Sequence, residues 1–131
     1  MKAASMALLM ALWTIPAQAA CPPGQSEMLT VRLYFGQSMH GKPVAASAWR
    51  DFVARMVTPR FPGGFTLYDA QGQWRDPRTR RIAREASKVI EIAAPQTRDL
   101  QVRIAEIRKD YAARFHQQSV GLLTLPGCGT F

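Results

Sequence analysis

Apolar and polar residues alternate along residues 28–35, MLTVRLYF. A period of two residues with β-branched and aromatic side chains is typical of a strand that buries one face. The apolar face would consist of Leu29, Val31, Leu33 and Phe35. The opposite face would carry Thr30, Arg32 and Tyr34. We therefore expect a half-buried strand near the start of the chain.

The period lengthens in residues 44–57, VAASAWRDFVARMV. The large apolar residues here are spaced i, i+3, i+4, i+7 and i+8, and are Trp49, Phe52, Val53, Met56 and Val57. This spacing predicts an amphipathic helix that packs on the apolar strand face. The helix should end near Thr58, because Pro59 disfavours helical geometry in the residue before it.

Two further strands are predicted in the middle of the chain. Residues 63–76, GGFTLYDAQGQWRD, begin with an alternating run that we expect to turn or bulge around Gly72. The segment DPRTRR then has turn chemistry. Residues 85–94, EASKVIEIAA, form the next strand, with Ile90 and Ile92 facing the core. Its opposite face would carry Glu85, Ser87, Val89 and Glu91.

A long helix and a short strand complete the pattern. Thr97 is a suitable N-cap for this helix, since a threonine hydroxyl can accept a backbone N–H of the first turn. The apolar stripe of the helix consists of Leu100, Ile104, Ile107, Tyr111 and Phe115. Residues 119–125, SVGLLTL, are typical of a strand that ends before Pro126.

The predicted order of elements is β-α-β-β-α-β. The simplest packing is an α+β, ferredoxin-like sandwich, in which a four-stranded antiparallel sheet of order 4-1-3-2 carries both helices on one face. This order places the start of strand one beside the end of strand four. Cys21 and Cys128, the two cysteines of the chain, lie just outside those ends. In an oxidising compartment such a pair predicts a disulfide.

Residues 1–19 have the features of a cleaved signal peptide. Lys2 precedes the apolar run ALLMALWTI, which is too short to span a bilayer, and the segment ends in small residues, PAQA. Cleavage would leave residues 20–131 as a single α+β domain, periplasmic or secreted. An outer-membrane lipoprotein acylated at Cys21 fits less well, because Gln18 stands where an apolar residue is needed. Acylation and the disulfide are alternatives for this cysteine.

The formal charge of the chain is +8, and thirteen of its seventeen basic residues are arginine. An exported protein with this charge would meet anionic lipids, envelope polymers or small anions, and we expect no nucleic-acid partner. We expect no nucleotide or other cofactor either, although FGQSMHGKP contains the pattern G-x-x-x-x-G-K. Pro43 follows that lysine, where a phosphate-binding loop needs Ser or Thr for Mg²⁺. Gly36 and Gly41 are better explained as turn residues.

Four segments resemble a family of small bacterial exported proteins and lipoproteins that is catalogued only as domain of unknown function 3574. They are LYFGQS, VTPRFPGGFTLYDAQGQWR, REASKVIEI and RKDYAARFHQQSVGLL, in this order. The resemblance covers roughly residues 33–123. It implies a bacterial envelope location, and it supplies no activity, cofactor or catalytic residue.

A sheet covered by helices on one side leaves its other face open. The expected occupants of that face are Arg32, Tyr34, Thr66, Tyr68, Glu85, Ser87 and Glu91. Arg32 should meet Glu91 on the neighbouring strand, while Tyr34 approaches Ser87 or Glu85. Three interpretations remain open: a solvated face with cross-strand pairs, an interface of a homodimer, or a ligand-binding or catalytic cleft.

No spacing in the chain requires catalysis. Tyr34, Glu85 and Ser87 are candidates for acid–base work, and His116 near the end of the second helix is a candidate general base. His40 lies in the first loop. Two histidines that are distant in sequence, without a cysteine or carboxylate cluster, do not indicate a zinc site, and we expect no metal.

The most basic segment of the chain follows Trp74. It contains Arg75, Arg78, Arg80, Arg81 and Arg84. This segment is either a solvated hairpin tip or a site that contacts an anion or a lipid headgroup, with Trp74 at the membrane surface. We therefore expect a non-enzymatic module that binds an envelope partner or an anionic ligand. The alternative is a small cofactorless enzyme whose cleft on the open sheet face is completed by dimerisation.

Overall fold

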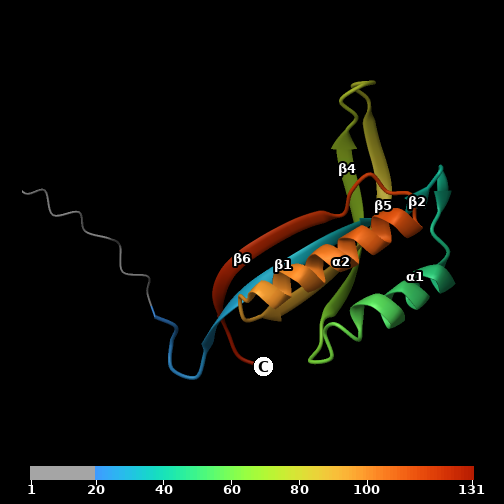
Figure 1. Cartoon of the computed structure of the whole chain (residues 1–131). Coiled ribbons are helices and arrows are strands. Elements are labelled where there is room, and N and C mark those ends of the chain that lie inside the picture. Colours follow the sequence, from blue (N-terminus) through green and yellow to red (C-terminus); the bar gives the residue numbers. More distant parts are fainter. Residues whose placement is uncertain (1–19) are drawn as a thin grey trace, which may run out of the picture.

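The computed structural model describes residues 20–131, and the predicted signal peptide lies outside the described residues. The elements in chain order are β1 (Ser26–Gly36), β2 (Ser38–Met39), β3 (Lys42–Pro43), α1 (Ala46–Phe52), the π-helical turn η1 (Val53–Val57), β4 (Thr66–Arg75), β5 (Ile82–Ala94), α2 (Arg98–Arg114) and β6 (Gly121–Gly129) (Figure 1). The predicted β-α-β-β-α-β order is thereby confirmed, with a small β2–β3 hairpin added.

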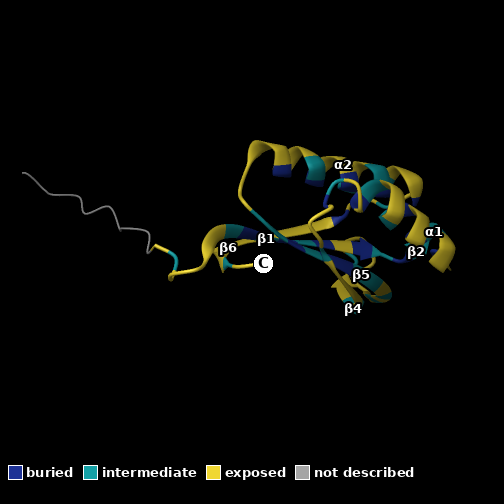
Figure 2. Cartoon of the chain, turned by 90° about the horizontal axis from the view of Figure 1, so that it is seen from below, coloured by how far each residue is buried: buried dark blue, intermediate teal, exposed yellow. Residues whose placement is uncertain are grey.

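The main sheet has the strand order β4-β5-β1-β6, and every neighbouring pair is antiparallel. This is the predicted order of a ferredoxin-like sandwich. Both helices lie on one side of the sheet, and the buried residues gather between the two layers (Figure 2). The alternation in β1 sets this arrangement, since its four predicted core residues are each at most 5% exposed.

An aromatic cluster fills the space between sheet and helices. The ring centroid of Phe35 lies 4.7 Å from that of Tyr111, 5.3 Å from Trp49 and 5.7 Å from Phe52. All four rings are buried, and Met56 packs at the edge of the core as a partly buried side chain. Burying aromatic side chains removes a large apolar area from water, so this cluster is a main source of stability.

The first helix is shorter than predicted and changes its hydrogen-bonding pattern. Val44 stays outside it, because its backbone N–H donates to the carbonyl of Gln37 at 2.8 Å. After Phe52 the chain forms a π-helical turn, in which the N–H of Thr58 donates to the carbonyl of Val53 five residues earlier, at 2.9 Å. A period of 3.6 residues does not reveal such a turn, so the sequence predicted one continuous helix.

The second helix follows the prediction closely. The hydroxyl of Thr97 accepts the N–H of Leu100 at 3.1 Å, which satisfies one of the free donors at the helix start. The predicted apolar stripe of this helix is buried throughout. No helix within residues 20–131 is long and apolar enough to cross a membrane.

Strands β4 and β5 form a long hairpin that extends beyond the helices (Figure 1). Their pairing continues without a break from Thr66 to Arg75, with Gly72 opposite Glu85. The prediction of a turn or bulge around Gly72 is therefore wrong. The turn lies instead in the segment DPRTRR, as its composition predicts. There the N–H of Asp76 donates to the carbonyl of Arg81 at 2.9 Å.

Strand β6 is longer than predicted and continues through Pro126 to Gly129. It lies at the edge of the sheet, where a proline can be accommodated because no further strand requires a backbone N–H from that residue. Beyond this proline, Cys128 forms the predicted disulfide with Cys21. The bond joins the chain before β1 to the last strand, and the described residues contain no free cysteine.

Candidate functional site

The open face of the sheet carries two adjacent rows of side chains. One row crosses the four strands as Thr66, Glu91, Arg32 and Leu123. The next row crosses them as Tyr68, Val89, Tyr34 and Gly121. Neither helix covers this face (Figure 2). The predicted meeting of Arg32 with Glu91 is confirmed.

Glu91 is the centre of a small polar network in these rows. The Nε of Arg32 lies 2.5 Å from Oε2 of Glu91, and the hydroxyl of Tyr68 donates to Oε1 at 3.2 Å. The hydrogen bond from Arg32 holds the pKa of Glu91 below its ordinary value, and the same contact raises the pKa of Arg32. The pKa of Tyr68 is raised, first by partial burial and then by the charge of Glu91. Glu91 is therefore ionised at neutral pH and serves as an acceptor.

The predicted catalytic candidates do not form a reactive group. Ser87 lies opposite Gly36 and its hydroxyl donates to the backbone carbonyl of Phe35 at 3.3 Å. Tyr34 lies in the row next to that of Ser87, opposite Val89. It packs over Gly121, since a Cβ added to Gly121 would lie 3.1 Å from the Cβ of Tyr34. No hydrogen bond within residues 20–131 joins Tyr34, Glu85 and Ser87 to one another. A nucleophile needs a base within hydrogen-bond reach, and these three side chains do not provide one.

The open face is more apolar than the sequence indicated. Val89 is buried on it, while Leu123 and Leu125 on the edge strand β6 are 41% and 44% exposed. Both leucines face the same side as Arg32, because β6 pairs Leu123 with Arg32 and Leu125 with Thr30. This exposure could not be predicted, since the run GLLTL does not alternate and its register depends on the pairing with β1.

A groove of about 620 Å³ lies beside Glu91, where β4 begins and β5 ends. Its lining includes Thr30, Phe61, Phe65, Thr66, Glu91 and Arg103. The guanidinium of Arg103 lies 4.8 Å above the ring of Phe61 and is paired with Asp99. Most of the groove surface is apolar, with Glu91 as its charged group on the sheet side. Such a surface can bind an apolar or mixed ligand.

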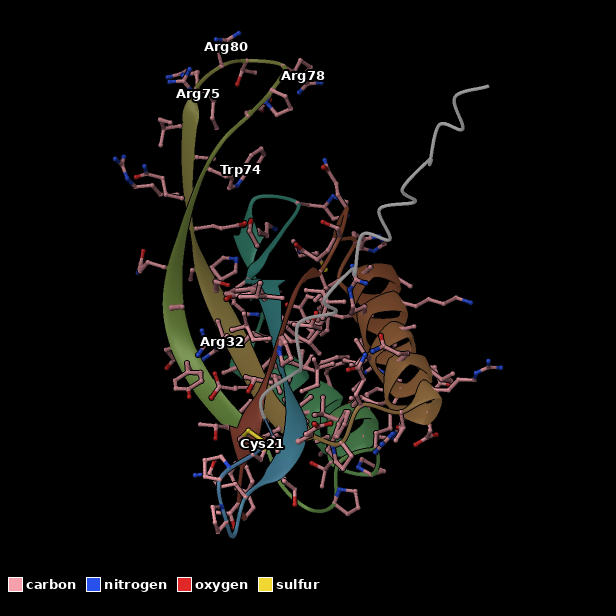
Figure 3. All side chains as sticks on the ribbon, turned by 90° about the vertical axis from the view of Figure 1, so that its left-hand side faces the viewer. Cys21, Arg32, Trp74, Arg75, Arg78 and Arg80 are labelled. Atoms are coloured by element: carbon pink, nitrogen blue, oxygen red, sulfur yellow. A yellow bond between two sulfur atoms is a disulfide. The ribbon has the colours of Figure 1, made fainter. Side chains whose placement is uncertain are left out.

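The arginine-rich hairpin lies far from the disulfide. Figure 3 shows Arg75, Arg78 and Arg80 at one end of the molecule and Cys21 at the other. All five predicted arginines are exposed. Two apolar residues near them are also exposed, Trp74 at 46% and Ile82 at 45%.

The turn of this hairpin is held by Asp76. Its Oδ1 accepts the backbone N–H of Arg78 at 2.8 Å and that of Thr79 at 3.1 Å. The bond from Thr79 and then that from Arg78 lower the pKa of Asp76. The carboxylate of the turn is therefore occupied with the backbone, and the arginine side chains project around it. Arg84 donates to the side chain of Gln73 at 2.8 Å.

The structure also brings together two histidines that are distant in the sequence. The imidazole rings of His40 and His116 have centroids 4.8 Å apart. His40 is in the turn between β2 and β3, and His116 follows the end of α2. Gly41, next to His40, has a positive φ of 76°, as expected for a turn glycine. Gly36, which was also expected in a turn, is instead the last residue of β1. The segment with the pattern G-x-x-x-x-G-K is thus a short β-hairpin.

Residues 30–131 match the family described as "Protein of unknown function (DUF3574)". This match includes both helices and all strands of the main sheet except the first four residues of β1. The chain belongs to the DUF3574 family. The resemblance noted from the four sequence segments is thereby confirmed. No curated protein matches the chain.

Two solved structures show how this DUF3574 fold compares with known proteins. They are a phage SAM lyase in complex with S-methyl-5'-thioadenosine and the same kind of enzyme in its apo state. Each is 16% identical to this chain and covers 88% of it, with a TM-score of 0.58. The chain covers 95% and 97% of those structures. At this identity the likeness shows a shared fold.

Proposed function

We propose that this DUF3574 protein is an exported, non-enzymatic binding module, and that its β4–β5 hairpin contacts an anionic lipid surface. The observation that carries the proposal is the charge of the hairpin. Within residues 20–131, none of its five arginines lies within ion-pair distance of a carboxylate. The disulfide supports export, because such bonds persist in oxidising compartments.

Five other arginines of the described chain are paired with a carboxylate, whereas Arg50, Arg98 and Arg108 are not. Those with a carboxylate partner are Arg32, Arg55, Arg60, Arg103 and Arg114. The hairpin arginines differ, since the nearby carboxylate of Asp76 accepts backbone N–H groups instead. Like charges on one tip repel each other, so an external anion would stabilise this arrangement.

Trp74 and Ile82 give the hairpin a second means of contact. Their side chains lie on opposite faces of the two-stranded ribbon, because Trp74 pairs with Ala83 and Ile82 pairs with Arg75. Tryptophan favours the boundary between water and hydrocarbon, where its ring is partly buried and its N–H is hydrated. A tip with cationic and apolar side chains therefore suits a headgroup layer better than a dissolved small anion.

The expected strength of this contact follows from the number of arginines. A basic residue near an anionic membrane contributes about 1 kcal/mol, so the hairpin could contribute about 5 kcal/mol at low salt. Salt at 0.1 M limits the attraction to about 10 Å. The experiment is sedimentation of the purified protein with vesicles of phosphatidylglycerol or of phosphatidylcholine. We expect binding to the anionic vesicles that decreases with salt, and little binding to the zwitterionic ones.

A second candidate function is a small cofactorless enzyme on the open face. The observation in its favour is the network of Glu91, Arg32 and Tyr68 beside a groove, rather than the predicted Tyr34, Glu85 and Ser87. The exposed Leu123 and Leu125 would allow a second copy to cover the network, as the dimerisation alternative requires. Because phage SAM lyase shares the fold, S-adenosylmethionine is the first substrate to try. Its depletion should be followed by chromatography, with a Glu91→Gln variant as control.

A further inference from the structure

His40 and His116 form a histidine pair that no other feature of the fold requires. Their ring centroids are 4.8 Å apart and the ring planes are tilted by 41°. Both side chains are exposed, and the chain contains just these two histidines. Seventy-five residues separate them in the sequence. Their contact therefore arises from the packing of the β2–β3 hairpin beside the end of α2.

The backbone holds both histidines in fixed positions. Each has a φ of 50°, in the left-handed region that is uncommon for residues with a side chain. His116 follows the last turn of α2, where the N–H of Gln117 donates to the carbonyl of Ala112 at 3.0 Å. Glycine or asparagine is the usual residue at such a helix end and in a two-residue hairpin turn. Histidine is one of the side chains that tolerate this region, so both turns can present an imidazole in a defined position.

A hydrogen bond links the two segments that carry the histidines. The side-chain Nε2 of Gln117 donates to the backbone carbonyl of Ser38. Gln117 directly follows His116, and Ser38 belongs to the strand that leads to His40. The N–H of Val44 donates to the carbonyl of Gln37 and closes the base of the β2–β3 hairpin. The two segments that carry the rings are therefore joined by the bond from Gln117, and the hairpin itself is closed at its base.

We propose that His40 and His116 together bind a divalent transition-metal ion, with Cu²⁺ bound most tightly. Imidazole is a favoured ligand of copper, nickel and zinc, and Cu²⁺ is the strongest binder of the divalent series. A metal at about 2.0–2.1 Å from a ring nitrogen lies about 3.2 Å from the ring centre. Two rings that meet a metal at about 90–110° then have centres about 4.5–5.2 Å apart. The observed 4.8 Å falls in this range.

The remaining positions around the ion would be filled by water. Among residues 20–131, no group of three or more His, Cys, Asp or Glu residues is placed to hold a metal. The proposed site is thus a two-ligand surface site, distinct from a closed structural centre with four protein ligands. The site uses no residue of the arginine hairpin or of the Glu91 network, so it does not depend on the proposed membrane contact.

The test is calorimetric titration of the purified protein with Cu²⁺, together with proton spectra recorded during titration with Zn²⁺. The variants are His40→Asn, His116→Asn and the double variant. Asparagine tolerates a positive φ, so these changes remove the imidazole and preserve both turns. We expect one ion per chain and simultaneous shifts of both imidazole resonances. Each single variant should lose about a hundredfold in affinity, because it removes the gain from linking two ligands.

The double variant should bind no better than either single variant, since one imidazole alone gives little affinity. Circular dichroism spectra should be unchanged in all three variants. Three outcomes would overturn the proposal. They are no heat of Cu²⁺ binding to the wild-type protein, binding by the double variant as tight as that of the wild type, or a loss of affinity in the double variant equal to the sum of the losses in the two single variants. The last outcome would mean that each histidine binds a separate ion.

Discussion

The guanidinium of Arg32 on β1 contacts the carboxylate of Glu91 on β5, with Nε 2.5 Å from Oε2. The two residues lie directly opposite each other in the strand register, and Tyr68 on β4 donates to the other carboxylate oxygen. Three of the four strands are therefore linked on the open face by side chains as well as by backbone hydrogen bonds. This network is charged at neutral pH.

The pH dependence of stability follows from the lowered pKa of Glu91. A carboxyl whose folded pKa is below its ordinary value of 4.5 stabilises the fold above that value, and the contribution is lost as the pH falls through the folded pKa. Both side chains are partly exposed, so solvent screening keeps this contribution small. Urea unfolding of the wild type and Glu91→Gln at pH 7 and below pH 4.5 should show a difference between the two proteins that shrinks with acidification. A constant difference would contradict this assignment.

The two tryptophans of the described chain should differ strongly in their effect on stability. Trp49 is 6% exposed in the aromatic cluster, whereas Trp74 is 46% exposed on the hairpin. Trp49→Ala should lower the free energy of unfolding by about 3–5 kcal/mol, as for other buried aromatic residues. The matched Trp74→Ala change should cost less than about 1 kcal/mol. Denaturant unfolding of both variants checks this, and similar losses would show that the core is wrongly assigned.

Tyr111 should determine part of the stability at alkaline pH. Its hydroxyl accepts from the side chain of Gln37 at 2.8 Å and donates to the carbonyl of Gly36 at 2.7 Å. Burial raises its pKa to about 12. A raised pKa means that the stabilisation is complete below the ordinary value of 10.0 and is lost as the pH rises from there towards about 12.

Replacing Tyr111 by phenylalanine tests this role. We expect Tyr111→Phe to lower the free energy of unfolding by about 1–3 kcal/mol at pH 7, because the Gln37 amide loses a buried partner. The variant should then lose less stability than the wild type between pH 9 and about 11, because phenylalanine does not ionise. Parallel stability curves for the two proteins would mean that another group dominates the alkaline transition.

The disulfide should contribute substantially to stability. It closes a loop with a sequence separation of 107 residues, so a Cys21→Ser, Cys128→Ser variant should be about 2–5 kcal/mol less stable than the oxidised protein. Thiol labelling of the unreduced, exported protein should detect no free cysteine. Two labelled thiols per chain would disprove the bond in the exported protein, and one would indicate acylation of Cys21.

Much of the fold could be predicted because local patterns agreed with each other. The alternation in β1, the stripe of α2 and the cap at Thr97 each specify one element. The spacing of Cys21 and Cys128 supported the strand order independently. The Arg32–Glu91 contact followed from that order, since residues on one face of neighbouring strands must meet.

The parts that escaped prediction depend on register or on very short elements. Leu123 and Leu125 reach the open face only through the pairing of β6 with β1, and GLLTL has no alternation that reveals it. Strands β2 and β3 have two residues each, too few to show a period. The contact between His40 and His116 results from their position beside α2, so it could not be read from sequence spacing. The π-helical turn after Phe52 likewise gives no signal in the apolar pattern.

The most direct test of the hairpin as a membrane contact compares two triple variants in vesicle binding at low salt. One changes Arg78, Arg80 and Arg81 to Gln on the hairpin, and the other changes Arg50, Arg98 and Lys109 to Gln on the helices. Both remove three exposed positive charges, and none of the six residues forms an ion pair within the described chain. We predict that the hairpin variant loses about a hundredfold in affinity for anionic vesicles, with thermal stability nearly unchanged, while the helix variant loses much less. Equal losses in the two variants, or full binding by the hairpin variant, would contradict the account.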